Sequence, residues 1–168
     1  GTTAVEALDA AYARGGYVLA VEGGVPTAFG GAAEWLMTDA SGRDVTIAQA
    51  VQKYASKAGA ILCMGTCASW GGIPAGGPNP TGIRGVGAFT GRRTINIAGC
   101  PPHPDWMVWP IVQLVLGKSI ATDSSGRLSE EVECGVSLQG HLSVSDNELR
   151  FLGGGKYEIA RYDLSTGR

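Results

Sequence analysis

Ala60-Ile-Leu-Cys-Met-Gly-Thr-Cys67 is the stretch of sequence that decides the fold. Its first five residues are a continuous apolar run of strand length, and a glycine ends the run shortly before a cysteine. A strand that is apolar on both faces is typical of a parallel sheet covered by helices. The stretch therefore predicts a central strand over 60–64, with Cys67 just beyond its carboxyl end.

Two other apolar runs of strand length flank this stretch in the sequence. Tyr17-Val-Leu-Ala-Val21 leads into Glu22, and Thr94-Ile-Asn-Ile97 leads into Gly99-Cys100-Pro101-Pro102. Helices are predicted between the strands, which implies right-handed crossovers and parallel pairing. The sequence therefore predicts an α/β fold in which helices cover both faces of a parallel sheet.

The helices follow from capping residues and periodicity. Thr3 and Glu6 fit a capping box, an apolar stripe of helical period follows Asp44, and Pro104 suits a first helical turn. Helices are accordingly predicted over about 4–14, 44–58 and 104–116, and residues 26–42 and 71–91 are expected to be loops.

The strand ends bring chemistry-bearing residues to one place. In open parallel sheets, ligands bind beyond the carboxyl ends of the strands. Glu22, Cys67 and Cys100 each follow the end of a predicted strand. We therefore expect these three side chains on one edge of the sheet, although more than thirty residues separate the two cysteines in the sequence.

The pattern changes near residue 120. We predict one α/β domain over 1–120 and an irregular or β-rich tail over 121–168. Within that tail, Leu149–Leu152 and Tyr157–Ala160 flank three glycines and predict a β-hairpin. The sequence does not indicate where this tail packs.

Composition limits the classes of function. The chain has 168 residues, 44% of them apolar and 17% charged, with a formal net charge of −2, so neither nucleic acid nor an anionic membrane is expected as a partner. No apolar run approaches the ~20 residues that a membrane span requires. No signal peptide is visible at the start, and any export signal is expected upstream of residue 1, so the compartment stays open.

Several interpretations of the two edge cysteines are compatible with the residues. Cys67 follows a Gly-Thr turn and Cys100 precedes two prolines, which suits thiolates held at a metal site. They could instead be inert, partly buried thiols. A zinc site could recruit Cys63, but Cys63 lies inside the apolar run and is expected in the core. Cys134 and His103 are weaker candidate ligands.

Other site types lack support. Gly117-Lys118-Ser119 resembles the end of a P-loop, but Val112 stands where its first glycine should be. No Gly-x-Ser-x-Gly elbow of a serine hydrolase occurs. Glu22 could accept a hydrogen bond from the glycine-rich loop, move protons, or lie against a bound cluster.

Together, these motifs resemble the small, electron-transferring subunit of [NiFe] hydrogenases over roughly residues 3–127. The matching segments are Val21-Glu22-Gly23 with Pro26, Gly65 to Ala75, Pro78-Asn79-Pro80-Thr81-Gly82, and Gly99 to Trp106. Gly-Ser/Thr-Cys-Ala and Gly-Cys-Pro-Pro alone also fit the iron–sulfur subunit of quinone reductases. The Val-Glu-Gly and Pro-Asn-Pro-Thr-Gly segments favour the hydrogenase.

The resemblance implies a flavodoxin-like domain with a proximal [4Fe-4S] cluster that relays electrons from H₂ oxidation at a Ni-Fe centre on a large partner subunit. Cys67 and Cys100 match two of its four ligands. Glu22, Gly65, Thr66, Gly99 and Pro101 match residues around it. Gly72 stands where oxygen-tolerant members carry an extra cysteine, which implies an ordinary cubane. The electron acceptor would be another protein or further clusters.

The sequence also departs from this family. The family's first strand, with a Cys-x-x-Cys ligand pair, is expected before residue 1. After Arg127 the chain does not match the family's His-x-x-Cys pair for the later clusters. Two alternatives therefore remain beside the hydrogenase subunit: a cluster-free flavodoxin-like scaffold that docks a protein partner, and the iron–sulfur subunit of a quinone-reductase-type complex.

Overall fold

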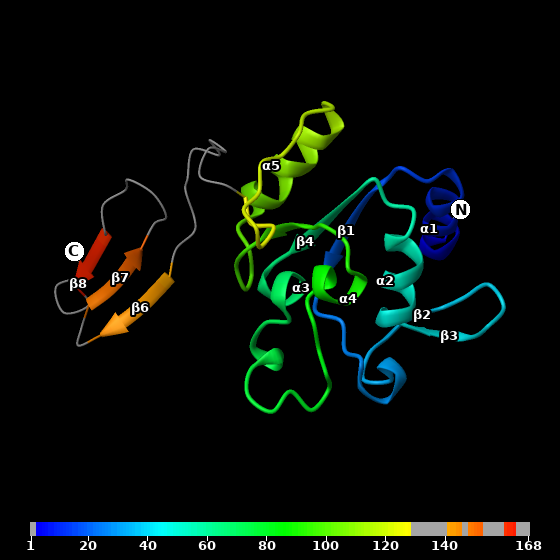
Figure 1. The fold of residues 1–168 in the computed structure, drawn as a ribbon, viewed down its shortest axis with the longest axis horizontal. Helices are drawn as coiled ribbons and strands as arrows, with labels where there is room; N and C mark the ends of the chain where they lie inside the picture. The colour runs from blue at the N-terminus through cyan, green and yellow to red at the C-terminus, as the bar shows by residue number, and fades with distance from the viewer. Residues whose placement is uncertain (1–2, 129–140, 146–147, 153–159, 164–168) are drawn as a thin grey trace. The chain divides into compact units, whose positions relative to one another are not determined.

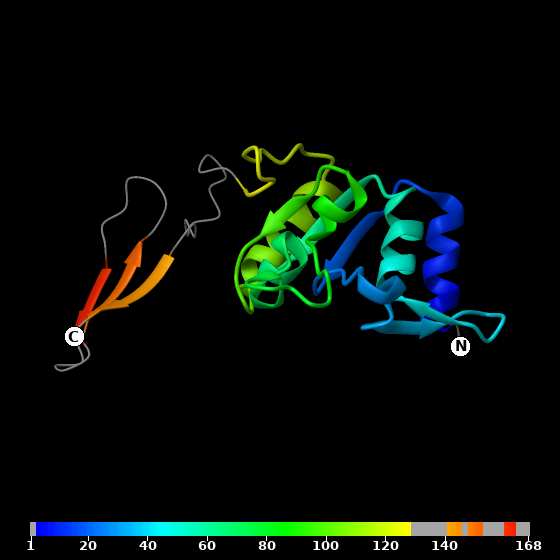
Figure 2. The ribbon, with the colours of Figure 1, turned by 60° about the horizontal axis from the view of Figure 1, so that its bottom comes forward.

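A computed structural model describes residues 3–128, 141–145, 148–152 and 160–163. The contacts divide the chain into two units, Gly1–Leu128 and Ser129–Arg168. Each unit is treated by itself below, and both are drawn in Figures 1 and 2.

The first unit is built on a three-stranded parallel sheet. Its strands are β1 (Val18–Glu22), β4 (Ala60–Met64) and β5 (Ile95–Ile97), and their order is β1-β4-β5. In the register, Glu22 lies opposite Met64, and Met64 lies opposite Ile97. All three carboxyl ends therefore meet at one edge, which confirms the parallel sheet expected from the apolar runs.

Three longer helices accompany the sheet: α1 (Ala4–Arg14), α2 (Ile47–Ala55) and α5 (Pro104–Val115). The predicted capping box opens α1, since the Glu6 N–H donates to Thr3 Oγ1 over 3.2 Å and the Thr3 N–H donates to Glu6 Oε2 over 2.8 Å. Helices α2 and α5 lie on opposite sides of the β1–β4 pair (Figure 1), as the prediction of two covered faces requires.

The core lies between α2 and one face of the sheet. Alternate residues of neighbouring strands, among them Val21, Ile61 and Cys63, pack there with Val51 of α2. The opposite face is buried at β4 and β5 but open at β1, where Val18 is 38% exposed. Coverage of this second face is therefore incomplete in the first unit.

The segment 26–42, expected to be a loop, contains regular structure. It holds a 3₁₀ turn, η1 (Ala28–Gly31), and β2 (Trp35–Thr38), which forms an antiparallel hairpin with β3 (Asp44–Thr46). Strand β2 is mostly exposed, and β3 has only three residues, so neither shows a buried period. Because Asp44–Thr46 belongs to β3, α2 begins at Ile47 rather than near residue 44.

The glycine-rich region after β4 also contains short helices that periodicity cannot reveal. They are α3 (Thr66–Trp70), η2 (Ile73–Ala75) and α4 (Val86–Thr90). Each spans less than two helical turns, too few to show an apolar stripe. Helix α3 starts one residue after β4, so Cys67 lies in its first turn.

The first unit extends beyond residue 120. The Asn96 N–H donates to Gly126 O over 2.7 Å, and Asn96 forms a parallel bridge with Arg127. These bonds attach residues 126–127 to β5. The contacts accordingly divide the chain after Leu128, whereas the composition suggests a division near 120.

The second unit contains an antiparallel sheet in the order β6-β7-β8. Its strands are β6 (His141–Ser145), β7 (Glu148–Leu152) and β8 (Ala160–Asp163). Strands β7 and β8 pair with Leu149 opposite Tyr162. Of the second strand of the predicted hairpin, Tyr157–Ala160, only Ala160 belongs to the described residues. The three glycines lie outside the described residues, and β6 was not predicted.

Within the described residues, no helix combines the length and the apolar character needed to cross a membrane.

The close approach of α3 to the start of α4 makes Gly85 a test of the fold. Its backbone angles are φ −68° and ψ 154°, which any residue adopts, but a Cβ there would overlap the Ser69 carbonyl. We expect Gly85→Ala to lower the free energy of unfolding by about 2 kcal/mol or more in urea denaturation.

Gly76→Ala is the matched control for this prediction. Gly76 has nearly the same angles, φ −73° and ψ 156°, and a Cβ there would lie 3.2 Å from Ile73 O. We expect it to stay within about 1 kcal/mol of the parent. Equal effects of the two substitutions would contradict the proposed steric cause.

Candidate functional site

Two loops are joined by backbone hydrogen bonds just beyond the sheet. The Gly65 N–H donates to Ile97 O over 2.9 Å, and the Thr66 N–H donates to Gly99 O over 2.8 Å. In return, the Gly99 N–H donates to Thr66 Oγ1 over 3.0 Å. These bonds continue the β4–β5 pairing past the strand ends and bring the next residue of each loop, Cys67 and Cys100, together.

The two thiols lie near each other at this edge, close enough for Cys100 to perturb the ionisation of Cys67. Cys67 is half-buried and Cys100 is exposed. Burial raises the pKa of the Cys67 thiol, and the charge and hydrogen bond of Cys100 and the charge of Glu22 raise it further. Two ionised sulfurs beside a carboxylate therefore repel each other, and a cation would relieve that repulsion.

Glycines let the backbone close around Cys67. Gly65 has φ +91°, and a Cβ there would lie 3.0 Å from Gly99 O. Gly72 has φ +63°, and a Cβ there would overlap Cys67 Sγ. Gly99 has φ +124° and lies against Pro102. Side chains at these positions would displace the Cys67 sulfur or the Cys100 turn.

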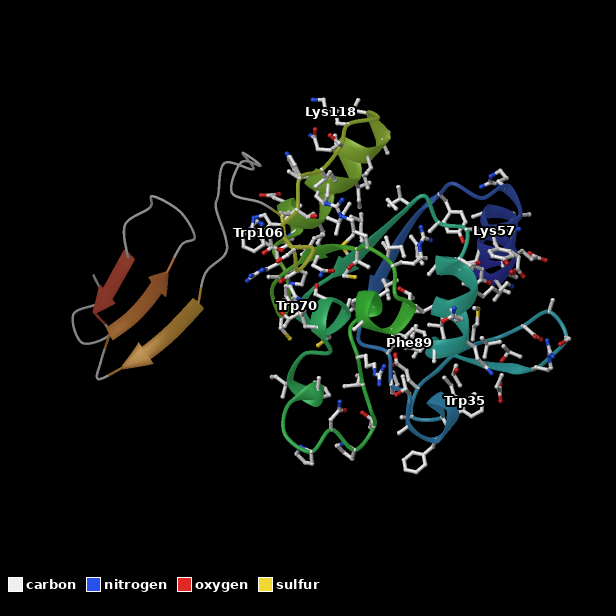
Figure 3. The ribbon with its side chains drawn as sticks, viewed as in Figure 1. Trp35, Lys57, Trp70, Phe89, Trp106 and Lys118 are labelled. Atoms are coloured by element: carbon white, nitrogen blue, oxygen red, sulfur yellow. The ribbon has the colours of Figure 1, made fainter. Side chains whose placement is uncertain are left out.

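The residues after Cys100 form the start of α5. The Cys100–Pro101 peptide is cis, and His103 is the N-cap of the helix, where its Nδ1 accepts a hydrogen bond from the Asp105 N–H over 3.3 Å. His103 thus has a capping role. Trp70 of α3 and Trp106 of α5 both lie at this edge of the unit (Figure 3).

Glu22 ends β1 with its side chain exposed. Among the described residues, its carboxylate makes no hydrogen bond to the glycine-rich loop. The predicted role of Glu22 as a hydrogen-bond acceptor for that loop is therefore not supported. Instead, burial raises the pKa of both Cys67 and Glu34, and the charge of Glu22 raises each further. Glu22 therefore contributes negative charge at the edge.

A second layer of loops supports the site, and sequence reasoning did not identify its bonds. Asn79 closes a turn by accepting from the Ile83 N–H over 2.9 Å and donating to Ile83 O over 3.0 Å. The Thr27 hydroxyl donates to Gly82 O over 2.8 Å, and Val25 forms a bridge with Arg84. The only sequence signal was the turn chemistry of Pro-Asn-Pro-Thr-Gly.

Of the other two cysteines, the described Cys63 does not join this edge. Cys63 lies fully buried within β4, on the core face, and burial raises its pKa to about 11. Cys134 lies outside the described residues. In the part of the chain that the structure describes, no three metal-ligating side chains gather at one point. The described edge thus offers a neighbouring pair of thiols, which is half of a four-thiolate set.

The chain matches a family model described as the NADH ubiquinone oxidoreductase 20 kDa subunit over residues 3–114. That range contains Glu22 and both edge cysteines.

The chain is also similar to curated hydrogenase subunits. It is 43% identical over 115 residues to the periplasmic [NiFe] hydrogenase small subunit of Solidesulfovibrio fructosivorans, and the match covers 68% of this chain and 34% of the relative. It is 30% identical over 177 residues to the F420 non-reducing hydrogenase I small subunit of Methanosarcina mazei, covering 95% and 44%.

Solved structures agree with these relatives. A [NiFeSe] hydrogenase from Desulfovibrio vulgaris Hildenborough matches with a TM-score of 0.61 and 33% identity, covering 66% of this chain and 45% of that one. The Actinobacterial-type NiFe-hydrogenase from Ralstonia eutropha H16 matches with a TM-score of 0.60 and 29% identity, covering 70% and 40%.

The comparisons confirm the predicted flavodoxin-like α/β fold. This chain spans about a third of the length of the first curated relatives that it matches. The family model matches more than half of the residues of the chain. The chain therefore belongs to the NADH ubiquinone oxidoreductase 20 kDa subunit family, and within that family it resembles the small subunits of [NiFe] hydrogenases.

Proposed function

We propose that this chain is part of the electron-transfer small subunit of a [NiFe]-type hydrogenase, and that Cys67 and Cys100 supply two ligands of a proximal [4Fe-4S] cluster. The observation that carries the proposal is the reciprocal pair of hydrogen bonds between Thr66 and Gly99, which brings the next residues, Cys67 and Cys100, near each other. Such a cluster takes four thiolates and transfers one electron at a time.

The donor set fits half of such a cluster. Thiolates are the preferred ligands of iron–sulfur clusters, and the negative charge of Glu22 beside two thiols favours a cation between them. Cys63 is excluded from the set because it is buried on the core face. The other two ligands are assigned to residues outside the described part, consistent with the Cys-x-x-Cys pair expected upstream.

The chain's own residues would hold the thiolates and limit solvent. Gly65, Gly72 and Gly99 allow the backbone to approach Cys67 and Cys100 without an intervening side chain. Backbone N–H groups and burial around the sulfurs tune the potential of a cluster. Half-buried Cys67 and exposed Cys100 give the site an inner and an outer ligand.

The proposed partner is a large subunit that carries a Ni-Fe centre and oxidises H₂. This assignment rests on the relatives, which are named as small subunits of hydrogenases. The quinone-reductase alternative is supported only by the family description, whereas the named relatives above are hydrogenases. The cluster-free scaffold remains an outcome of the experiment below.

Substitution of the edge cysteines tests the cluster. After anaerobic reconstitution with iron and sulfide, in the full assembly with the large subunit, we expect a reduced [4Fe-4S] EPR signal. Cys67→Ala and Cys100→Ala should each remove most of the proximal signal, because each deletes one of four thiolates. Cys63→Ala is the matched control and should keep it, since this thiol is in the core.

An unchanged proximal signal in Cys67→Ala would contradict the ligand assignment. The absence of any such signal in the parent assembly would favour the scaffold instead.

The close approach of Gly72 to Cys67 gives a second test. We expect Gly72→Ala to lower the iron content of the reconstituted protein several-fold, because the new methyl group occupies the position of Cys67 Sγ. Gly15→Ala is the control: Gly15 has φ +70° and ψ 178°, against +63° and −156° at Gly72, but a Cβ there would meet only Lys57 O, at 3.8 Å. Both positions have a similar backbone conformation that favours glycine, so equal iron loss would overturn the proposed contact.

A further inference from the structure

We propose that Cys67 and Cys100 form a reversible disulfide bond when no metal is bound, so that the same thiol pair has an oxidised, closed state. The bond would join the start of α3 to the loop after β5. Its formation depends only on the described residues.

Local geometry places the two cysteines near each other. Disulfides need Cα atoms about 4.4–6.8 Å apart. The Thr66 N–H donates to Gly99 O over 2.8 Å and the Gly99 N–H donates to Thr66 Oγ1 over 3.0 Å, and Cys67 and Cys100 directly follow these two residues. Cys100 is also close enough to raise the pKa of the Cys67 thiol.

Exposure differs between the two thiols in a way that favours an intramolecular bond. Cys100 is exposed and can meet a small oxidant, while half-buried Cys67 lies near it and can act as the resolving thiol. Buried Cys63 packs on the core face with Val21 and Ile61, so it is not accessible to an oxidant or to another thiol. Among the described cysteines, the pairing is therefore determined.

The oxidant is a small-molecule disulfide such as oxidised glutathione. The Cys100 sulfur attacks one sulfur of that disulfide, forming a mixed disulfide and releasing the first thiol. Cys67 then attacks the Cys100 sulfur, releasing the second thiol. The two cysteines lose two electrons and two protons, and the small disulfide gains both as two thiols.

The oxidised state would control metal loading. A disulfide sulfur is no longer a thiolate and binds iron poorly, so the closed pair should resist cluster assembly until it is reduced. This consequence rests on the proposed function, whereas formation of the bond does not.

The experiment uses the full 168-residue chain, freed of iron by a chelator and reduced anaerobically, in a Cys134→Ser background. The chain is incubated with oxidised glutathione and its free thiols are alkylated. We expect the intact mass to lose two hydrogens, and fragment spectra to link the peptides of Cys67 and Cys100, with Cys63 remaining free. Dithiothreitol should restore both thiols. Cys67→Ser and Cys100→Ser are the controls and should not lose two hydrogens.

A stable glutathione adduct on Cys100 without the internal link, or a link to Cys63, would overturn the inference. Iron uptake is measured separately in the full assembly with the large subunit, prepared in oxidised and in reduced form, and we expect about tenfold less in the oxidised form. If the bond forms but the reduced assembly binds no iron, the proposed function fails and the disulfide stands. If the reduced assembly binds iron but the bond does not form, the disulfide fails and the proposed function stands.

Discussion

The site depends on the paired hydrogen bonds between Thr66 and Gly99, because they hold two loops that the sheet alone would leave free. Parallel strands deliver their ends to one edge, but a loop that leaves a strand can turn in many directions. Here the Thr66 backbone donates to Gly99, and the Gly99 backbone donates to the Thr66 hydroxyl. These bonds therefore also fix the positions of the neighbouring residues, Cys67 and Cys100.

Much of the sheet could be predicted from the sequence, because buried parallel strands are largely apolar, and the strands at 18–22, 60–64 and 95–97 stand out for that reason. The edge position of Cys67 and Cys100 followed from that topology. Their roles as ligands stay a proposal, since adjacency does not identify what binds.

The short helices, the hairpin and the tertiary contacts could not be predicted from the sequence, for physical reasons. Helices α3 and α4 are each five residues long, too short for a periodic stripe, and the β2–β3 hairpin is mostly exposed. The need for glycine at position 72 could not be predicted, because it arises only when the folded chain brings Cys67 Sγ to where a Cβ of residue 72 would lie. The hydrogen bonds of Asn79 and Thr27 likewise join segments that are distant or irregular in the chain.

The open face of β1 has a consequence for how the protein behaves in solution. Val18 and Ala20 present apolar surface on a strand that ends the order of the described sheet, where backbone groups are also free to pair. Any surface that covers this strand stabilises the folded state by mass action. Where that surface belongs to a second copy of the chain, the midpoint of unfolding depends on protein concentration, and dilution lowers it.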